Sequence, residues 1–310
     1  MKKVILAVFL NMIIFTSNAV GQISGTDDWG IGARALGMGR AFICLPDDAT
    51  AVNLNPACLS DIDYRSLLTS YEQVRNSTST VSYLSITLPF KKIGTIGISI
   101  NRYMSNIGVI NNIFYYKDSN SMFSIAYGKV IKENVSLGAN IKHSNFNEYG
   151  INKSNIVSND ISLLLRDVAN IEDLKVSVGI KNIFRTETLG SNSDLMPVSI
   201  RLGSAYKYLD KKGIISCDIE KGSDYFNWAI GTEYVLNNIF AIQVGFNGDD
   251  VIHKESSVGI GYKYRYMYFN MAYVIDGDKT STFVSGSWNF DVFKKEYNEL
   301  KKKNSNRSSR

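Results

Sequence analysis

Few residues in this sequence are of the types that carry out catalysis or bind metals. The chain has two histidines and three cysteines, which are His143, His253, Cys44, Cys58 and Cys217. The histidines are far apart, neither has a convincing serine or cysteine partner nearby, and the Gly-x-Ser-x-Gly nucleophile elbow does not occur. The cysteines show no Cys-x-x-Cys spacing. We therefore expect no catalytic residue, no metal and no cofactor, while a disulfide between Cys44 and Cys58 remains open.

Charged side chains form the second group with a possible role. Arg34 and Arg40 lie near the N-terminus, and a guanidinium that is taken out of water needs a carboxylate or carbonyl partner. Three carboxylates of later segments are candidate partners, namely Asp218, Glu220 and Glu233. The alternative is that these charges only line a wet interior, together with others expected on the same face, Lys142, Asp160, Lys181 and Arg201.

Binding of nucleotides or nucleic acids is not expected. Gly30, Gly32 and Ala35 match a loose dinucleotide fingerprint, but no strand precedes them and no βαβ unit follows. Of the net charge of +5, Lys2 and Lys3 contribute +2 and the segment 291–310 contributes +4, so the remaining body carries −1. A nearly neutral body does not suit a nucleic-acid surface.

The first 21 residues read as a secretory signal peptide. Lys2 and Lys3 precede an apolar run from Val4 to Phe15, and small and polar residues follow, with Ala19 and Gly21 at the −3 and −1 positions of a cleavage before Gln22. The apolar run is too short for a membrane-spanning helix, which needs about 20 residues. The sequence therefore predicts export and removal of residues 1–21.

Most of the chain after Tyr64 alternates between apolar and polar or small residues, which is the period of a β-strand. We expect fourteen strands, at 64–73, 80–90, 94–103, 121–131, 134–146, 157–167, 174–184, 197–208, 213–221, 225–236, 238–247, 255–265, 266–275 and 280–290. Ten residues tilted by about 40° rise roughly 25 Å, the height of an outer-membrane apolar band. Short connections alternate with longer ones, of which 104–120 is the longest.

These features predict an all-β fold, a 14-stranded antiparallel transmembrane β-barrel over 64–290. A soluble β-sandwich is the alternative, but its water-facing side would carry Lys, Glu and Thr rather than Gly, Ser, Ala and Asn. Residues 22–63 precede the first strand and are predicted to fill the lumen as a plug or hatch, because a barrel of this size has room inside it. The segment 291–310 is predicted to be a basic periplasmic tail.

The proposed plug carries a family resemblance. Its motif consists of Gly32, Ala33, Arg34, Leu36, Gly37, Met38, Gly39, Asp47, Asp48, Ala49, Asn55, Pro56 and Ala57. This motif resembles the N-terminal motif of the PorV/PorQ family, which is similar to the FadL long-chain fatty-acid transporters. Arg40 and Cys58 depart from it, since glycine is usual at both positions. The resemblance implies a fourteen-stranded outer-membrane barrel of a Gram-negative bacterium, in a family of which some members serve type IX secretion and many have no assigned role.

Two functions follow from the resemblance. The first is a binding or accessory role in protein secretion, with secretion-system components or exported cargo as partners. The alternative is a FadL-like channel for uptake of hydrophobic small molecules such as long-chain fatty acids, with a hydrophobic ligand as partner. Both place the chain among outer-membrane lipids, and neither makes it an enzyme. A purely structural barrel is a third reading.

Overall fold

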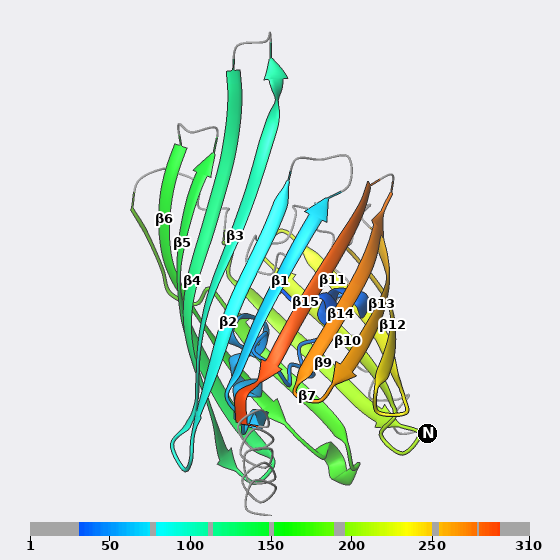
Figure 1. The fold of residues 1–310 in the computed structure, drawn as a ribbon. Coiled ribbons are helices and arrows are strands. Elements are labelled where there is room, and N and C mark those ends of the chain that lie inside the picture. The colour runs from blue at the N-terminus through cyan, green and yellow to red at the C-terminus, as the bar shows by residue number, and fades with distance from the viewer. Residues whose placement is uncertain are drawn as a thin grey trace, which may run out of the picture.

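The computed structural model describes residues 31–74, 79–110, 114–148, 152–188, 196–249, 254–277 and 279–291 (Figure 1). Residues 1–21, His253 and the tail beyond Asp291 lie outside these ranges. The strands are β1 (Ser66–Val74), β2 (Thr80–Phe90), β3 (Gly94–Ile110), β4 (Phe114–Lys132), β5 (Val135–Glu148), β6 (Asn152–Leu165), β7 (Leu174–Lys181), β8 (Arg185–Thr188), β9 (Ser199–Tyr208), β10 (Gly213–Gly222), β11 (Phe226–Leu236), β12 (Phe240–Asp249), β13 (Lys254–Tyr264), β14 (Met267–Asp276) and β15 (Lys279–Asn289). The short helical segments are α2 (Ala33–Gly37), α3 (Ala51–Leu54), η2 (Pro56–Asp61) and η3 (Val168–Asn170).

The strands close into a barrel in which neighbouring described strands pair antiparallel. β1 pairs with β2 on one side and with β15 on the other, so the first and last strands complete the ring. β7 and β8 both pair with β6, at different heights, and together make one interrupted wall strand. The ring therefore has fourteen strands, and the predicted antiparallel 14-stranded barrel is confirmed.

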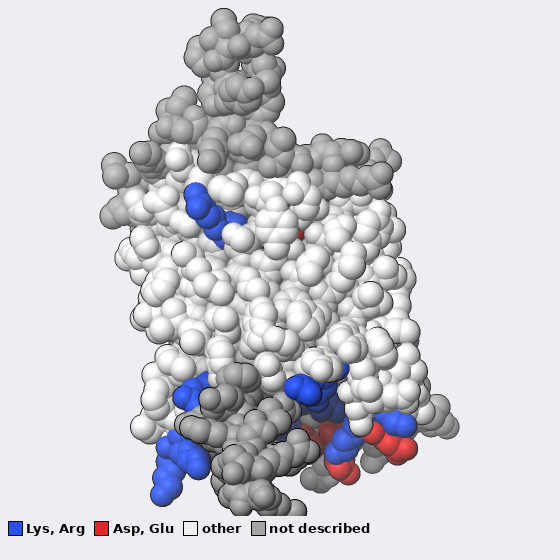
Figure 2. All heavy atoms as spheres, viewed as in Figure 1, with Lys and Arg blue, Asp and Glu red and all other residues white. Residues whose placement is uncertain are grey.

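The two faces of the wall have opposite polarity. On β5, Leu137 and Ile141 point outward and are exposed, whereas Ser136 and Asn140 point inward and are buried. On the face shown in Figure 2, the same alternation produces a broad uncharged band in the middle of the wall, and both basic and acidic side chains gather below it at the end with the short turns. This is the polarity expected of a barrel that meets lipid outside and polar groups inside. Among the described residues, no helix is long and apolar enough to cross a membrane.

Two elements differ from the sequence prediction. The expected long loop at 104–120 is largely strand, because β3 and β4 continue pairing through Ser105 and Asp118. Backbone pairing persists there although apolar and polar residues no longer alternate regularly in the sequence. The expected strand 174–184 breaks after Lys181, where Asn182 has a φ of +56°. Its backbone N–H donates to Asp160 Oδ1 at 2.9 Å, so a side chain replaces a ladder partner at the break.

Candidate functional site: a segment packed inside the barrel

Residues 31–62, called here the inner segment, pack against the inward-facing side of the wall near the short-turn end (Figure 1). These residues form no sheet of their own, and the short helical segments α2, α3 and η2 satisfy part of their backbone hydrogen-bonding groups. Asn55 caps η2, since its Oδ1 accepts from Ala57 N at 3.1 Å. Its amide nitrogen donates to Ile43 O at 2.7 Å and to Ser177 Oγ at 2.8 Å on β7. Asn55 therefore ties two parts of the inner segment to the wall.

Glycines on the wall let η2 approach the backbone of the strands. A methyl group placed on Gly138 would overlap the backbone of Pro56 and Ala57, and one on Gly128 would overlap Pro56 O. Ala57 N also donates to Ser162 Oγ at 3.0 Å. The Asn-Pro-Ala part of the motif thus docks on a surface that has to lack side chains.

A second glycine surface holds α2 on the other side of the lumen. Methyl groups on Gly231 and Gly245 would overlap the backbone of Met38 and Gly39. Gly39 itself has a φ of +62°, which favours glycine, and its N–H donates to Ser257 Oγ at 3.0 Å. Ser257 Oγ in turn donates to Gly37 O at 3.1 Å. The glycines of the motif and those of the wall meet backbone to backbone.

Arg34 makes the strongest polar link between the inner segment and the wall. Its Nε and Nη2 donate to the two carboxylate oxygens of Glu233, both at 2.7 Å, and its Nη1 donates to Asp47 Oδ1 at 2.6 Å. Glu233 is nearly buried, with 3% of its side chain exposed, and also accepts from Gln243 Nε2 at 2.9 Å. Burial by itself acts to lower the pKa of Arg34, but Asp47 and Glu233 outweigh it and hold that pKa above its usual value. Arg34 therefore stays charged while it bridges two carboxylates.

The other charges that the sequence singled out have different partners. Arg40 Nε lies 3.2 Å from Glu255 Oε2 and pairs with none of the three suggested carboxylates. Asp218 Oδ2 accepts from the backbone N–H of Ile43 at 2.8 Å. Glu220 lies 3.1 Å from Arg201 on the wall itself. Lys142 and Asp160 form a buried pair at 2.8 Å. Of the suggested arginine–carboxylate pairs, the structure of the described residues contains that of Arg34 with Glu233.

Sequence reasoning missed an ion cluster at the end of η2. Asp61 accepts from Lys175 Nζ at 2.7 Å and from Arg166 Nη2. Burial acts to raise the pKa of Asp61, but Lys175 and Arg166 outweigh it, so that pKa lies below its usual range. Nothing in the sequence distinguishes Asp61 from other polar residues near a strand start, because its partners lie more than a hundred residues away.

Asp47 and Asp48 of the motif differ in their surroundings. Asp47 is 61% exposed and reaches Arg34 from the water side. Asp48 Oδ1 accepts from the backbone N–H of Thr50 at 2.9 Å and from its hydroxyl at 2.5 Å. Burial and the neighbouring Asp47 raise the pKa of Asp48. Asp48 therefore shapes the turn before α3, while Asp47 belongs to the bridge around Arg34.

A cavity of about 350 Å³ opens beside this bridge at the short-turn end of the lumen. Arg34, Asp47 and Glu233 line one part of it, and the aromatic rings of Tyr64 and Tyr268 line another. This volume is within the range of small-molecule sites. The inner segment thus meets the wall at a cavity with both charged and aromatic surfaces.

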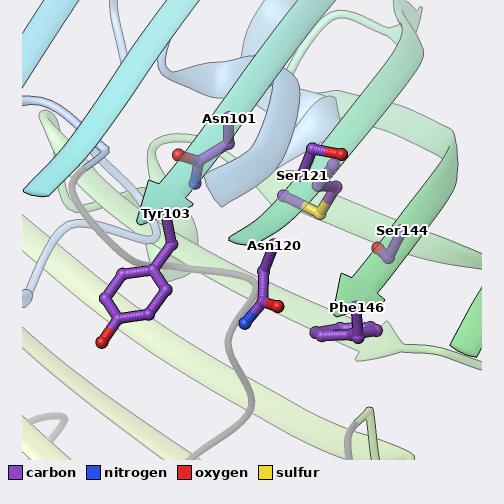
Figure 3. Close-up of a pocket in the computed structure, with 7 residues that line it drawn as sticks. Asn101, Tyr103, Asn120, Ser121, Ser144 and Phe146 are labelled. Carbon is purple, nitrogen blue, oxygen red and sulfur yellow. The ribbon is translucent and has the colours of Figure 1, made fainter. Parts of the chain in front are cut away.

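A smaller cavity lies higher in the lumen, between β3, β4 and β5 (Figure 3). Asn101, Tyr103, Asn120, Ser144 and Phe146 are among its lining residues, and its volume is about 20 Å³, enough for about one water molecule. The Ser144 hydroxyl is buried without a hydrogen-bond partner among the described residues. The upper wall therefore presents polar groups to the lumen rather than a continuous apolar lining.

The residues with catalytic chemistry are dispersed. His143 is exposed on the outer face of β5, opposite Phe123 on β4. Cys217 lies on the outward side of β10, whereas Cys44 and Cys58 are buried free thiols of the inner segment. Within the part of the chain that the structure describes, no three metal-ligating side chains come together.

No protein-family model and no curated protein matches this chain. Solved structures do: the toluene transporter TodX of Pseudomonas putida has a TM-score of 0.64 at 12% identity, over 84% of this chain and 98% of that one. The CymD monoaromatic hydrocarbon channel gives 0.60 at 12% identity, over 84% and 97%. A Pseudomonas aeruginosa FadL homologue gives 0.58 at 12% identity, over 88% and 100%. These likenesses do not confirm the PorV/PorQ assignment, which stays a prediction. They show that the chain has a FadL-like 14-stranded barrel fold.

Proposed function

We propose that this protein is an outer-membrane channel for the uptake of small hydrophobic molecules and that its inner segment is the plug of that channel. The observation that carries the proposal is a closed 14-stranded barrel with a chain segment docked inside it, in a fold shared with channels named for toluene and monoaromatic hydrocarbons. The cavity of about 350 Å³ beside Arg34 supports it, because it offers a small molecule a place where inner segment and wall meet.

The secretion role rests on the motif resemblance alone, whereas the structural neighbours favour the channel. A plug has a physical basis in the two glycine surfaces and the Arg34 bridge, which fix the inner segment to opposite parts of the wall. The fold and the apolar outer band support the outer-membrane location.

Deletion of the gene is expected to slow the initial uptake of labelled toluene by intact cells at least severalfold, and the full-length protein is expected to restore it. The reason is that deletion removes the route through the outer membrane that the proposed channel supplies. Labelled oleate in parallel cultures tests whether longer chains use the same route. Equal uptake of both compounds with and without the protein contradicts the channel. Copurification of exported proteins with the chain would instead favour secretion.

A further inference from the structure

Two neighbouring hairpin ends at the short-turn end form a basic patch. Lys91 and Lys92 lie in the turn between β2 and β3, and Lys129 and Lys132 lie at the end of β4. The ends are adjacent because β3 pairs with β4 up to Thr95 and Gly128, and because Tyr127 OH donates to Ile93 O. We call these four lysines the rim patch.

The rim patch carries an excess of positive charge. No described residue forms an ion pair with any of its four lysines, and Glu133 is the one acidic residue in the two turns that carry it. By contrast, Lys211 in the turn between β9 and β10 lies 3.0 Å from Asp173 and 3.3 Å from Glu172. The cations of the rim patch are therefore available to an external anion.

Apolar side chains protrude at the same hairpin ends. Ile93 is 60% exposed and Ile131 is 62% exposed, and Phe90 and Val130 beside them are also exposed. Apolar side chains at a turn tip are unfavourable in water, at roughly 25 cal/mol for each Å². They suit the boundary between head groups and acyl chains, where long lysine side chains extend toward phosphates.

We propose that the rim patch binds the head groups of anionic phospholipids in the leaflet at the short-turn end. The proposal rests on the outer-membrane location in the proposed function but not on transport. The exposed side chains of Ile93, Ile131, Phe90 and Val130 enter the acyl-chain region of the leaflet. The lysines of the rim patch extend to the phosphates of the same leaflet. Charge complementarity selects phosphatidylglycerol over the zwitterionic phosphatidylcholine.

The test titrates the purified full chain in detergent micelles with phosphatidylglycerol or phosphatidylcholine and counts bound lipids by native mass spectrometry. The double variant Lys92→Gln, Lys132→Gln is expected to weaken phosphatidylglycerol binding about 25-fold, on the basis of about fivefold per cation near a membrane surface. Phosphatidylcholine binding is expected to change less than twofold. The matched control Lys211→Gln removes a cation that already has carboxylate partners, and it is expected to have an effect below twofold.

Glu133→Lys provides the opposite change of two charge units and is expected to tighten phosphatidylglycerol binding by about 25-fold. Heat-modifiable migration on gels establishes that each variant is a folded barrel. Equal binding of the two lipids by the unchanged protein, or equal loss in the Lys211 control and the double variant, overturns the proposal. Loss of toluene uptake is a separate measurement, so a failed channel function and a failed lipid site are told apart.

Discussion

Alanine at Gly245 is expected to release α2 from the wall while leaving the barrel assembled. The new methyl group would overlap the backbone of Met38 and Gly39, which cannot rotate away as a side chain would. Overpacking of this kind costs about 1–3 kcal/mol, which corresponds to a rise of roughly 5- to 150-fold in the undocked population of the inner segment. Cleavage of the inner segment by a protease added to the folded barrel measures this population.

Gly179→Ala is the matched control for that variant. Gly179 also lies on a wall strand, but the nearest atom to its added methyl group is Ile161 O at 3.5 Å, an ordinary contact. Cleavage in this control is expected to equal that of the unchanged protein. If Gly245→Ala also equals it, then close backbone contact at the α2 surface does not hold the inner segment.

Removal of the Arg34 side chain is expected to have the second large effect. Arg34→Ala leaves Glu233 buried with a hydrogen bond from the neutral Gln243 amide in place of the guanidinium, and breaking a buried pair in this way costs about 3–5 kcal/mol. The Asp47 side of the bridge adds little, since that carboxylate is exposed. We expect cleavage of the inner segment to increase by at least about 100-fold, because cleavage tracks the open population when opening is fast.

Two further variants make the Arg34 test specific. Arg34→Lys keeps the charge but cannot donate to both oxygens of Glu233 and to Asp47 in the same fixed fork, so an intermediate rate is expected. Lys211→Ala removes an exposed ion pair, which contributes about 0–1 kcal/mol, and is expected to leave the rate unchanged. Equal rates for Arg34→Ala and Lys211→Ala would show that the glycine surfaces alone hold the inner segment.

The barrel was predictable because lipid outside and polar groups inside impose alternation on each strand, as on β5 and β12. The extension of β3 and β4 through Ser105 and Asp118 was not, since the alternation of apolar and polar residues in the sequence fades there while backbone pairing continues. The break at Asn182 likewise depends on the side chain of Asp160, on a different strand.

The sequence predicted which types of residue make up the candidate site, but not which arginine pairs with which carboxylate. An arginine in an apolar, glycine-rich segment indicates a need for a carboxylate, and Arg34 has one in Glu233. Which carboxylate each arginine meets depends on strand register and on where the segment lies around the ring, and one sequence specifies neither. Arg40 therefore has its partner in Glu255, which sequence reasoning did not consider. Ser257, which hydrogen-bonds to the backbone of Gly37 and Gly39, could not be singled out in the sequence, because many serine residues face the lumen.

The central claim is that residues of the N-terminal segment close a channel, and single-channel conductance in planar bilayers tests it most directly. The comparison is between the full chain and a variant that lacks residues 24–60, each first established as a folded barrel by heat-modifiable migration. We expect a low conductance for the full chain and a severalfold higher, steadily open conductance for the deletion variant. Equal conductance of the two folded barrels would contradict it.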